Sequence, residues 1–108
     1  FIYTGFEPEV IIVKNTSAGE GWIILDGTIP ISSASSTVAG VGNPRNEFLY
    51  ANTSAKQNGP SDGGAFELLD FLSNGIKIRA NTGSFNQNTI GIIYMAFAKS
   101  PFKTANAR

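Results

Sequence analysis

The sequence predicts an all-β domain, an antiparallel β-sandwich of about seven strands with a jelly-roll-like arrangement. Short segments rich in Ile, Val, Phe and Tyr, which favour pleated strands, recur along the chain. Clusters of Gly, Asn, Ser and Pro, which favour turns, separate these segments. No segment carries an apolar stripe of helical period over a helical length. At 108 residues, the chain suits one domain of ordinary size.

The first half of the chain contributes four of the expected strands. Residues 1–6, 10–15 and 21–26 are runs of aromatic and β-branched residues, and polar or glycine-containing stretches separate them. The fourth strand, 47–51, contains Phe48-Leu49-Tyr50 and follows a long polar stretch. Because no Met opens the chain and Phe1 already stands in strand-like sequence, we expect residues 1–108 to be the C-terminal part of a longer protein.

The second half contributes the strands 66–72, 75–80 and 89–98. The apolar spacing of 65–72 also fits two helical turns, but Ser73-Asn74-Gly75 follows at once and favours a strand. Asn-Gly supplies the positive φ angles of a type I′ turn, and Ile76-Lys77-Ile78-Arg79 then alternates as a returning strand. The sequence therefore predicts a tight hairpin here.

Three long polar segments, 28–45, 52–64 and 81–88, connect the strands. Connections longer than about 12 residues are uncommon in compact domains unless they bind something or move. An aromatic ring beside Asn or Gln amides can hold a sugar, because the ring packs on the sugar's apolar face and the amides bond its hydroxyls. We therefore predict receptor-binding residues in and next to these loops. They are Tyr50, Asn52, Phe85, Asn86 and Gln87.

Three strands are apolar on both faces, namely 10–13, 22–25 and 90–98. A strand of a free-standing sandwich alternates between apolar and polar residues, so both faces of these strands should be covered. Since monomers rarely expose large apolar patches, we expect another copy of the chain to supply the cover. The alternatives are central strands capped by the long loops, or a parallel pair inside the domain. The predicted interface residues are Ile12, Ile24, Ile92, Tyr94 and Phe97.

The composition excludes several classes of function. Eight Lys and Arg balance eight Asp and Glu, and the chain has neither His nor Cys. Zinc sites of the usual type, Cys nucleophiles and His-based triads are therefore excluded, and the balanced charge argues against nucleic-acid binding. The longest apolar run, 90–98, is too short to span a membrane. We expect no metal and no cofactor.

Paired carboxylates are the remaining acid–base candidates. Glu7 and Glu9 flank Pro8, and Glu67 and Asp70 share a predicted strand. Three positions along a strand is an odd step, so Glu67 and Asp70 should point to opposite faces. We interpret these groups as solvated surface acids and do not expect an enzyme.

An ordered set of motifs resembles a β-rich module common at or near the C-terminus of phage and prophage tail proteins, especially in marine phages. The resemblance covers residues 5–102, although the long 28–45 segment departs from the family's usual pattern. The motifs are Gly5-Phe6-Glu7-Pro8-Glu9 with the apolar run and Lys14-Asn15 after it, Gly21-Trp22-Ile23-Ile24-Leu25-Asp26, Tyr50-Ala51-Asn52, Phe71-Leu72-Ser73-Asn74-Gly75-Ile76-Lys77, and Ile93-Tyr94-Met95-Ala96-Phe97-Ala98 before Pro101-Phe102.

The resemblance implies an all-β virion module, a homotrimer, and no catalytic machinery. We therefore expect a tail-fibre or tail-spike domain that attaches the virion to a host-surface glycan through its loops, without nucleic acid or membrane insertion. The alternative is a capsid-decoration or tail-assembly protein that contacts other virion proteins and has no receptor role. An enzyme acting on surface polysaccharide is a third hypothesis.

Overall fold

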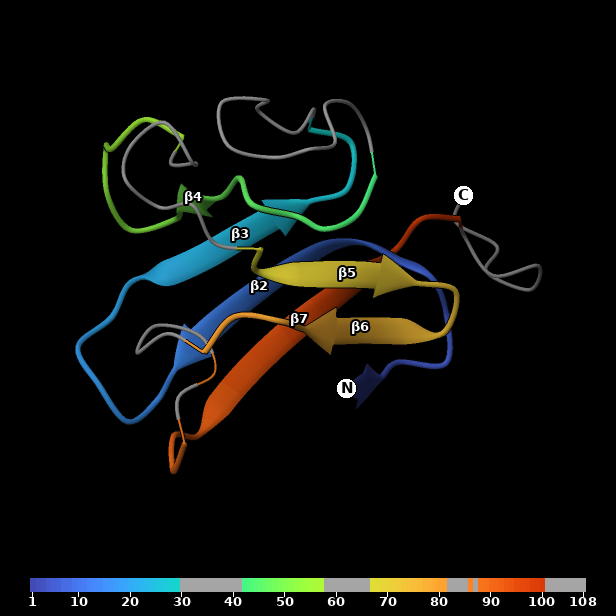
Figure 1. The fold of residues 1–108 in the computed structure, drawn as a ribbon. Helices are drawn as coiled ribbons and strands as arrows, with labels where there is room; N and C mark the ends of the chain where they lie inside the picture. The colour runs from blue at the N-terminus through green and yellow to red at the C-terminus, as the bar shows by residue number, and fades with distance from the viewer. Residues whose placement is uncertain (30–41, 58–66, 82–85, 87, 101–108) are drawn as a thin grey trace, which may run out of the picture.

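Seven short strands form two antiparallel sheets that pack against each other (Figure 1). The computed structural model describes residues 1–29, 42–57, 67–81, 86 and 88–100, and within these residues there is no helix. The predicted all-β sandwich is therefore confirmed. The strands are β1 (Ile2–Tyr3), β2 (Pro8–Asn15), β3 (Trp22–Asp26), β4 (Leu49–Tyr50), β5 (Leu69–Leu72), β6 (Gly75–Ile78) and β7 (Ile92–Ala98).

The larger sheet has the strand order β4-β3-β2-β7. Its centre is β2, where Ile12 lies opposite Ile24 of β3 on one side and Met95 of β7 on the other. Because side chains alternate along a strand, Ile11 and Val13 point the other way and are buried. The first and last thirds of the chain thus meet in one sheet.

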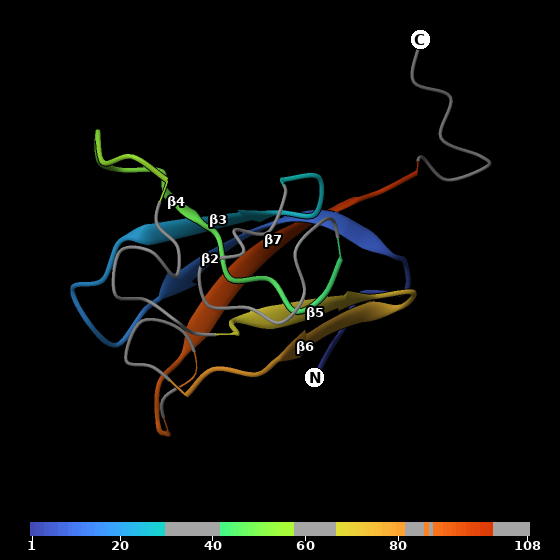
Figure 2. The ribbon, with the colours of Figure 1, turned by 45° about the horizontal axis from the view of Figure 1, so that its top comes forward.

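The smaller sheet has the order β1-β6-β5 and covers one face of the larger sheet. Figure 2 shows β5 and β6 as a separate layer on one side of β2, β3 and β7. The apolar core lies between the two layers, where side chains of both sheets lose contact with water. It consists of Ile11, Val13, Ile23, Leu25, Leu68, Leu69, Ile76 and Ala80.

The β5–β6 hairpin is present, but its turn differs from the expected type. Leu72 pairs with Gly75, so Ser73 and Asn74 form the turn, and neither Asn74 nor Gly75 has a positive φ. The predicted type I′ turn is therefore wrong. Gly75 is needed instead for the approach of β1, because a Cβ at this position would collide with the Ile2 carbonyl oxygen.

All seven strands lie where the sequence places them; six are shorter than predicted, whereas β2 begins two residues earlier, at Pro8. The expected strand 66–72 begins only at Leu69, and the first strand covers only Ile2 and Tyr3 of residues 1–6. All strand pairs in the described ranges are antiparallel, so the alternative of a parallel pair is not seen there. Parts of all three predicted loops, 30–41, 58–66, 82–85 and 87, lie outside the described residues.

Replacing Gly75 by Ala should destabilise the fold, because the added methyl group must push β1 away from β6. We expect a loss of about 2 kcal/mol in the free energy of unfolding, measured by urea denaturation. Gly19→Ala is the matched control, since nothing lies within 4 Å of a Cβ there. Equal stabilities of the two variants would contradict the packing of β1 against Gly75.

Candidate functional site

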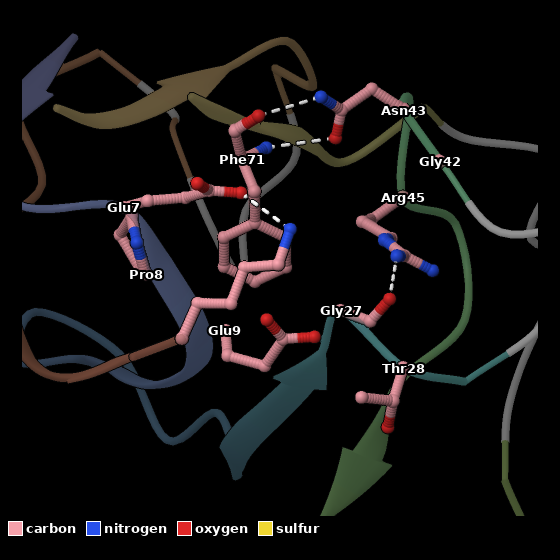
Figure 3. A pocket seen from close by; sticks show the side chains of 10 residues that line it. Glu7, Pro8, Glu9, Gly27, Thr28, Gly42, Asn43, Arg45 and Phe71 are labelled. Atoms are coloured by element: carbon pink, nitrogen blue, oxygen red, sulfur yellow. Dashed lines mark hydrogen bonds and ion pairs between the residues drawn. The ribbon is translucent and has the colours of Figure 1, made fainter. Parts of the chain in front are cut away.

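A pocket of about 480 Å³ lies at the end of the sandwich where β2 begins and β3 ends (Figure 3). Segments far apart in the sequence meet there: the start of β2, the turn after β3, residues 42–45, β5 and the residue after β7. Its walls therefore come from both sheets. The lining residues are Glu7, Pro8, Glu9, Gly27, Thr28, Gly42, Asn43, Arg45, Phe71 and Lys99.

Arg45 connects the two sheets at this pocket. Its backbone pairs with β5, with the Arg45 amide 2.7 Å from the Leu69 carbonyl oxygen. Its guanidinium crosses to the end of β3, where Nη1 donates to the Ile29 carbonyl oxygen at 2.6 Å and Nη2 donates to the Gly27 carbonyl oxygen. The residue is only 5% exposed, and its buried Nε has no hydrogen-bond partner among the described residues.

The charge of Arg45 is balanced without a direct ion pair in the described ranges. Burial lowers the pKa of Arg45, and the carboxylates of Glu9 and Asp26 oppose this effect. Two carbonyl oxygens and two nearby acids thus replace the water that the guanidinium loses. The arrangement keeps a cation in the wall of the pocket.

Asn43 fixes the aromatic side of the pocket. Its side-chain amide donates to the Phe71 carbonyl oxygen at 2.6 Å and accepts from the Phe71 amide at 2.8 Å. Since β5 is the edge of its sheet, Asn43 supplies the two bonds that a neighbouring strand would make. The half-buried Phe71 ring lies within the pocket, as Figure 3 shows.

Glu9 enters the pocket from β2, and Gly27 leaves room for it. A Cβ on Gly27 would lie 3.1 Å from the Glu9 carboxylate and 3.0 Å from the Glu9 carbonyl oxygen. The same carbonyl oxygen accepts a hydrogen bond of 2.6 Å from the Gly27 amide. Glycine is therefore the residue that allows the turn after β3 to lie against Glu9.

Glu7 and Lys99 form the exposed side of the pocket. Lys99 Nζ lies 2.8 Å from Glu7 Oε1, and the Lys99 amide donates to the Glu7 carbonyl oxygen at 2.9 Å. The hydrogen bond and the charge of Glu7 raise the pKa of Lys99. The ammonium group therefore stays charged at neutral pH.

The pocket combines an aromatic ring with four charged groups of zero net charge, two carboxylates and two cations. Charged groups make stronger hydrogen bonds to hydroxyls than neutral ones do. A polar, uncharged ligand with one apolar face would satisfy such a lining. No group of three His, Cys, Asp or Glu residues in the described ranges could hold a metal ion.

None of the predicted receptor-binding residues that the structure describes lines the pocket. Tyr50 packs its ring edge-on against Phe48, with centroids 5.3 Å apart, and contacts the core. Asn52 accepts a hydrogen bond of 3.0 Å from the Trp22 amide. Tyr50 and Asn52 therefore lie near the start of β3, whereas the pocket lies at its other end. Asn86 is exposed. Phe85 and Gln87 fall outside the described residues.

The predicted interface residues divide between the two faces of the larger sheet. Ile12, Ile24 and Phe97 lie on the face turned away from the β1-β6-β5 sheet, here called the outer face. Ile92 and Tyr94 lie on the opposite face, where Ile92 packs against the core. The five residues therefore do not form one continuous surface.

Two acids that the sequence analysis treats as solvated are held by one arginine. Arg79 Nε lies 2.7 Å from Asp70 Oδ2, and Arg79 Nη1 lies 3.3 Å from Glu67 Oε2. The Asp70 side chain is only 7% exposed, so its assignment to the surface is wrong. Both acids reach Arg79 because Glu67 precedes β5 and does not follow the alternation expected of a strand. The hydrogen bond that Arg79 donates to Asp70 raises the pKa of Arg79.

Most of the pocket is not apparent from the amino-acid sequence. Glu7 and Glu9 form a pair in the sequence, but Arg45 stands in a predicted loop, Phe71 in the predicted strand 66–72 and Lys99 beyond the last predicted strand. The one available signal was a cation after Gly42-Asn43-Pro44, a sequence rich in turn-forming residues.

No part of the described chain is a helix long and apolar enough to cross a membrane.

Comparison with known proteins gives one match. The profile of a family described as "Domain of unknown function (DUF7483)" matches residues 1–101. No curated protein and no solved structure matches the chain. The matched range includes every residue that lines the pocket.

Arg45→Met should lower the free energy of unfolding by about 3 kcal/mol, because two buried carbonyl groups lose charged donors. Urea denaturation monitored by tryptophan fluorescence measures this loss. Lys77→Met is the control, since Lys77 is exposed on β6, and we expect a change within about 0.5 kcal/mol. A similar small change for Arg45→Met would show that Arg45 does not tie the sheets together.

Proposed function

The chain belongs to the DUF7483 family, and we propose that it is a non-catalytic virion module, a tail-fibre or tail-spike domain that attaches a phage to a host-surface glycan. The pocket between Glu7, Glu9, Arg45, Phe71 and Lys99 is the observation that carries this proposal. The motif resemblance to phage tail proteins supplies the biological setting.

The chemistry of the pocket suits a sugar. Phe71 offers a flat apolar surface for the C–H face of a sugar ring, while the carboxylates accept and the cations donate hydrogen bonds to hydroxyl groups. The volume of about 480 Å³ falls within the range of small-molecule sites. The zero net charge of the lining favours a neutral sugar over a polyanion.

A single shallow site of this kind binds weakly, and attachment then depends on repetition. A virion appendage carries several copies of its domains, and many weak contacts on one surface add up through their high effective concentration. No step of this mechanism needs a nucleophile, a metal or a cofactor.

The second candidate function is assembly: a capsid-decoration or tail-assembly protein whose surfaces contact other virion proteins. The outer face of the larger sheet favours it, because apolar side chains on that face are half-exposed. The two functions use different surfaces, so one domain can serve both.

Glu7→Gln should weaken glycan binding at least about tenfold, which corresponds to about 1.4 kcal/mol, because the pocket loses a charged acceptor and the partner of Lys99. A panel of neutral and acidic oligosaccharides would first identify the best binder. Calorimetric titration with that sugar then compares the variant with the unmodified chain.

Glu67→Gln is the matched control, since Glu67 is also an exposed acid paired with a cation but lies outside the pocket. We expect its affinity to equal that of the unmodified chain. Equal affinity for Glu7→Gln would place binding elsewhere, and release of sugar fragments during incubation would contradict a non-catalytic role.

A further inference from the structure

The outer face of the larger sheet carries three rows of side chains. The middle row crosses all four strands, because Leu49 pairs with Ile24, Ile24 with Ile12 and Ile12 with Met95. One flanking row contains Trp22, Lys14 and Ile93, and the other contains Asp26, Val10 and Phe97. Eight of these ten side chains are apolar.

No described strand covers this face. The smaller sheet packs on the other side, as Figure 2 shows. On β7, Ile93, Met95 and Phe97 are 50%, 51% and 52% exposed. An apolar patch that crosses every strand of a sheet is typical of an interaction surface, and a second sheet is its usual cover.

The two charged side chains on the outer face indicate which kind of partner would bind it. Lys14 lies in one flanking row and Asp26 in the other, about 14 Å apart along the strands. Lys14 donates to the Asn15 and Ala18 carbonyl oxygens, and Asp26 accepts from Thr28 and acts through its charge on Arg45. Within the described ranges neither side chain is in a direct ion pair. The face is therefore positive at one end and negative at the other.

Such a face is complementary to the same face of a second copy that is rotated by a two-fold axis. A two-fold axis in the plane of the contact, perpendicular to the strands, brings the Lys14 row of one copy over the Asp26 row of the other. The apolar middle row then meets itself. With parallel strands, the Lys14 row would lie over the Lys14 row and the Asp26 row over the Asp26 row, which brings like charges together and is unfavourable.

We propose that a second copy of this chain covers the outer face, sheet against sheet, with the strands of the two copies antiparallel. This pairing uses Ile12, Ile24 and Phe97 of the predicted interface and leaves Ile92 and Tyr94 outside it. The placement of Lys14 and Asp26 favours pairs over the trimer that the resemblance implies. The pairing goes beyond the proposed glycan binding and does not depend on it.

The contact is small. The four strands and three rows span about 15 Å by 14 Å. The area of this contact is smaller than the surface area that a permanent dimer buries. We therefore expect a reversible dimer that forms at micromolar protein concentration or above. On a particle, tethering of the copies would strengthen it.

Sedimentation equilibrium of the full chain, from about 1 µM to about 500 µM, tests the pairing. We expect a monomer–dimer equilibrium that Met95→Glu abolishes, because a carboxylate would lie in the apolar middle row. Tyr3→Glu is the control, since Tyr3 is 69% exposed on the other sheet, and it should leave the equilibrium unchanged. Circular dichroism checks that both variants fold.

Charge exchange tests the antiparallel arrangement. Lys14→Glu and Asp26→Lys should each weaken self-association about tenfold or more, because each homodimer would then contain like charges in contact. An equal mixture of the two variants should associate at least as tightly as the unmodified chain, since each contact in the mixed pair joins opposite charges.

Three results would overturn the proposal. A monomer at every concentration would mean that no second copy binds, and a trimer as the smallest assembly would exclude the two-fold pair. Unchanged self-association of Lys14→Glu and Asp26→Lys would exclude the antiparallel strands, because in a parallel pair each change only replaces one contact between like charges by another. Sugar titration of Met95→Glu separates the two proposals, because loss of pairing leaves the pocket intact.

Discussion

The buried guanidinium of Arg45 is the interaction on which the pocket depends. A sandwich is usually held by apolar contact between its layers, which is strong but does not fix how one layer slides over the other. Arg45 adds directional bonds, because its backbone joins β5 while its side chain donates to the Gly27 and Ile29 carbonyl oxygens beyond β3. In a chain with only 15% charged residues, this one buried cation joins the two layers at the pocket end.

The two functional surfaces are separated by the geometry of the larger sheet. Its inner face forms the core, its end contributes Glu7, Glu9 and Gly27 to the pocket, and its outer face carries the apolar rows. A ligand in the pocket and a protein on the outer face would therefore not compete. This arrangement explains why β2 and β3 are apolar on both faces. One face packs in the core of this chain, and the other face is the surface that we assign to a second copy.

The sequence predicts the strands well and the pocket poorly, for physical reasons. Strand positions follow from local preferences, and the stretches rich in Ile and Val around Ile12, Ile24 and Met95 are unambiguous. The pocket depends on long-range contacts: Arg45 and Phe71 acquire their roles only when a loop lies along the edge of β5. The Asn-Gly sequence likewise indicates a turn at Gly75, whereas the lack of a side chain at this position allows the neighbouring β1 strand to approach.

Asn43 has a consequence for the chemical durability of the protein. Its side-chain amide occupies the hydrogen-bonding groups at the edge of β5, because it is both donor and acceptor toward the Phe71 backbone. Hydrolysis of that amide to a carboxylate would remove the donor and place a negative charge against the Phe71 carbonyl oxygen. The common route of such ageing closes a ring through the nitrogen of the next residue, and here that residue is Pro44, whose nitrogen carries no hydrogen. The contact that protects this edge is thus shielded from spontaneous deamidation by its own neighbour.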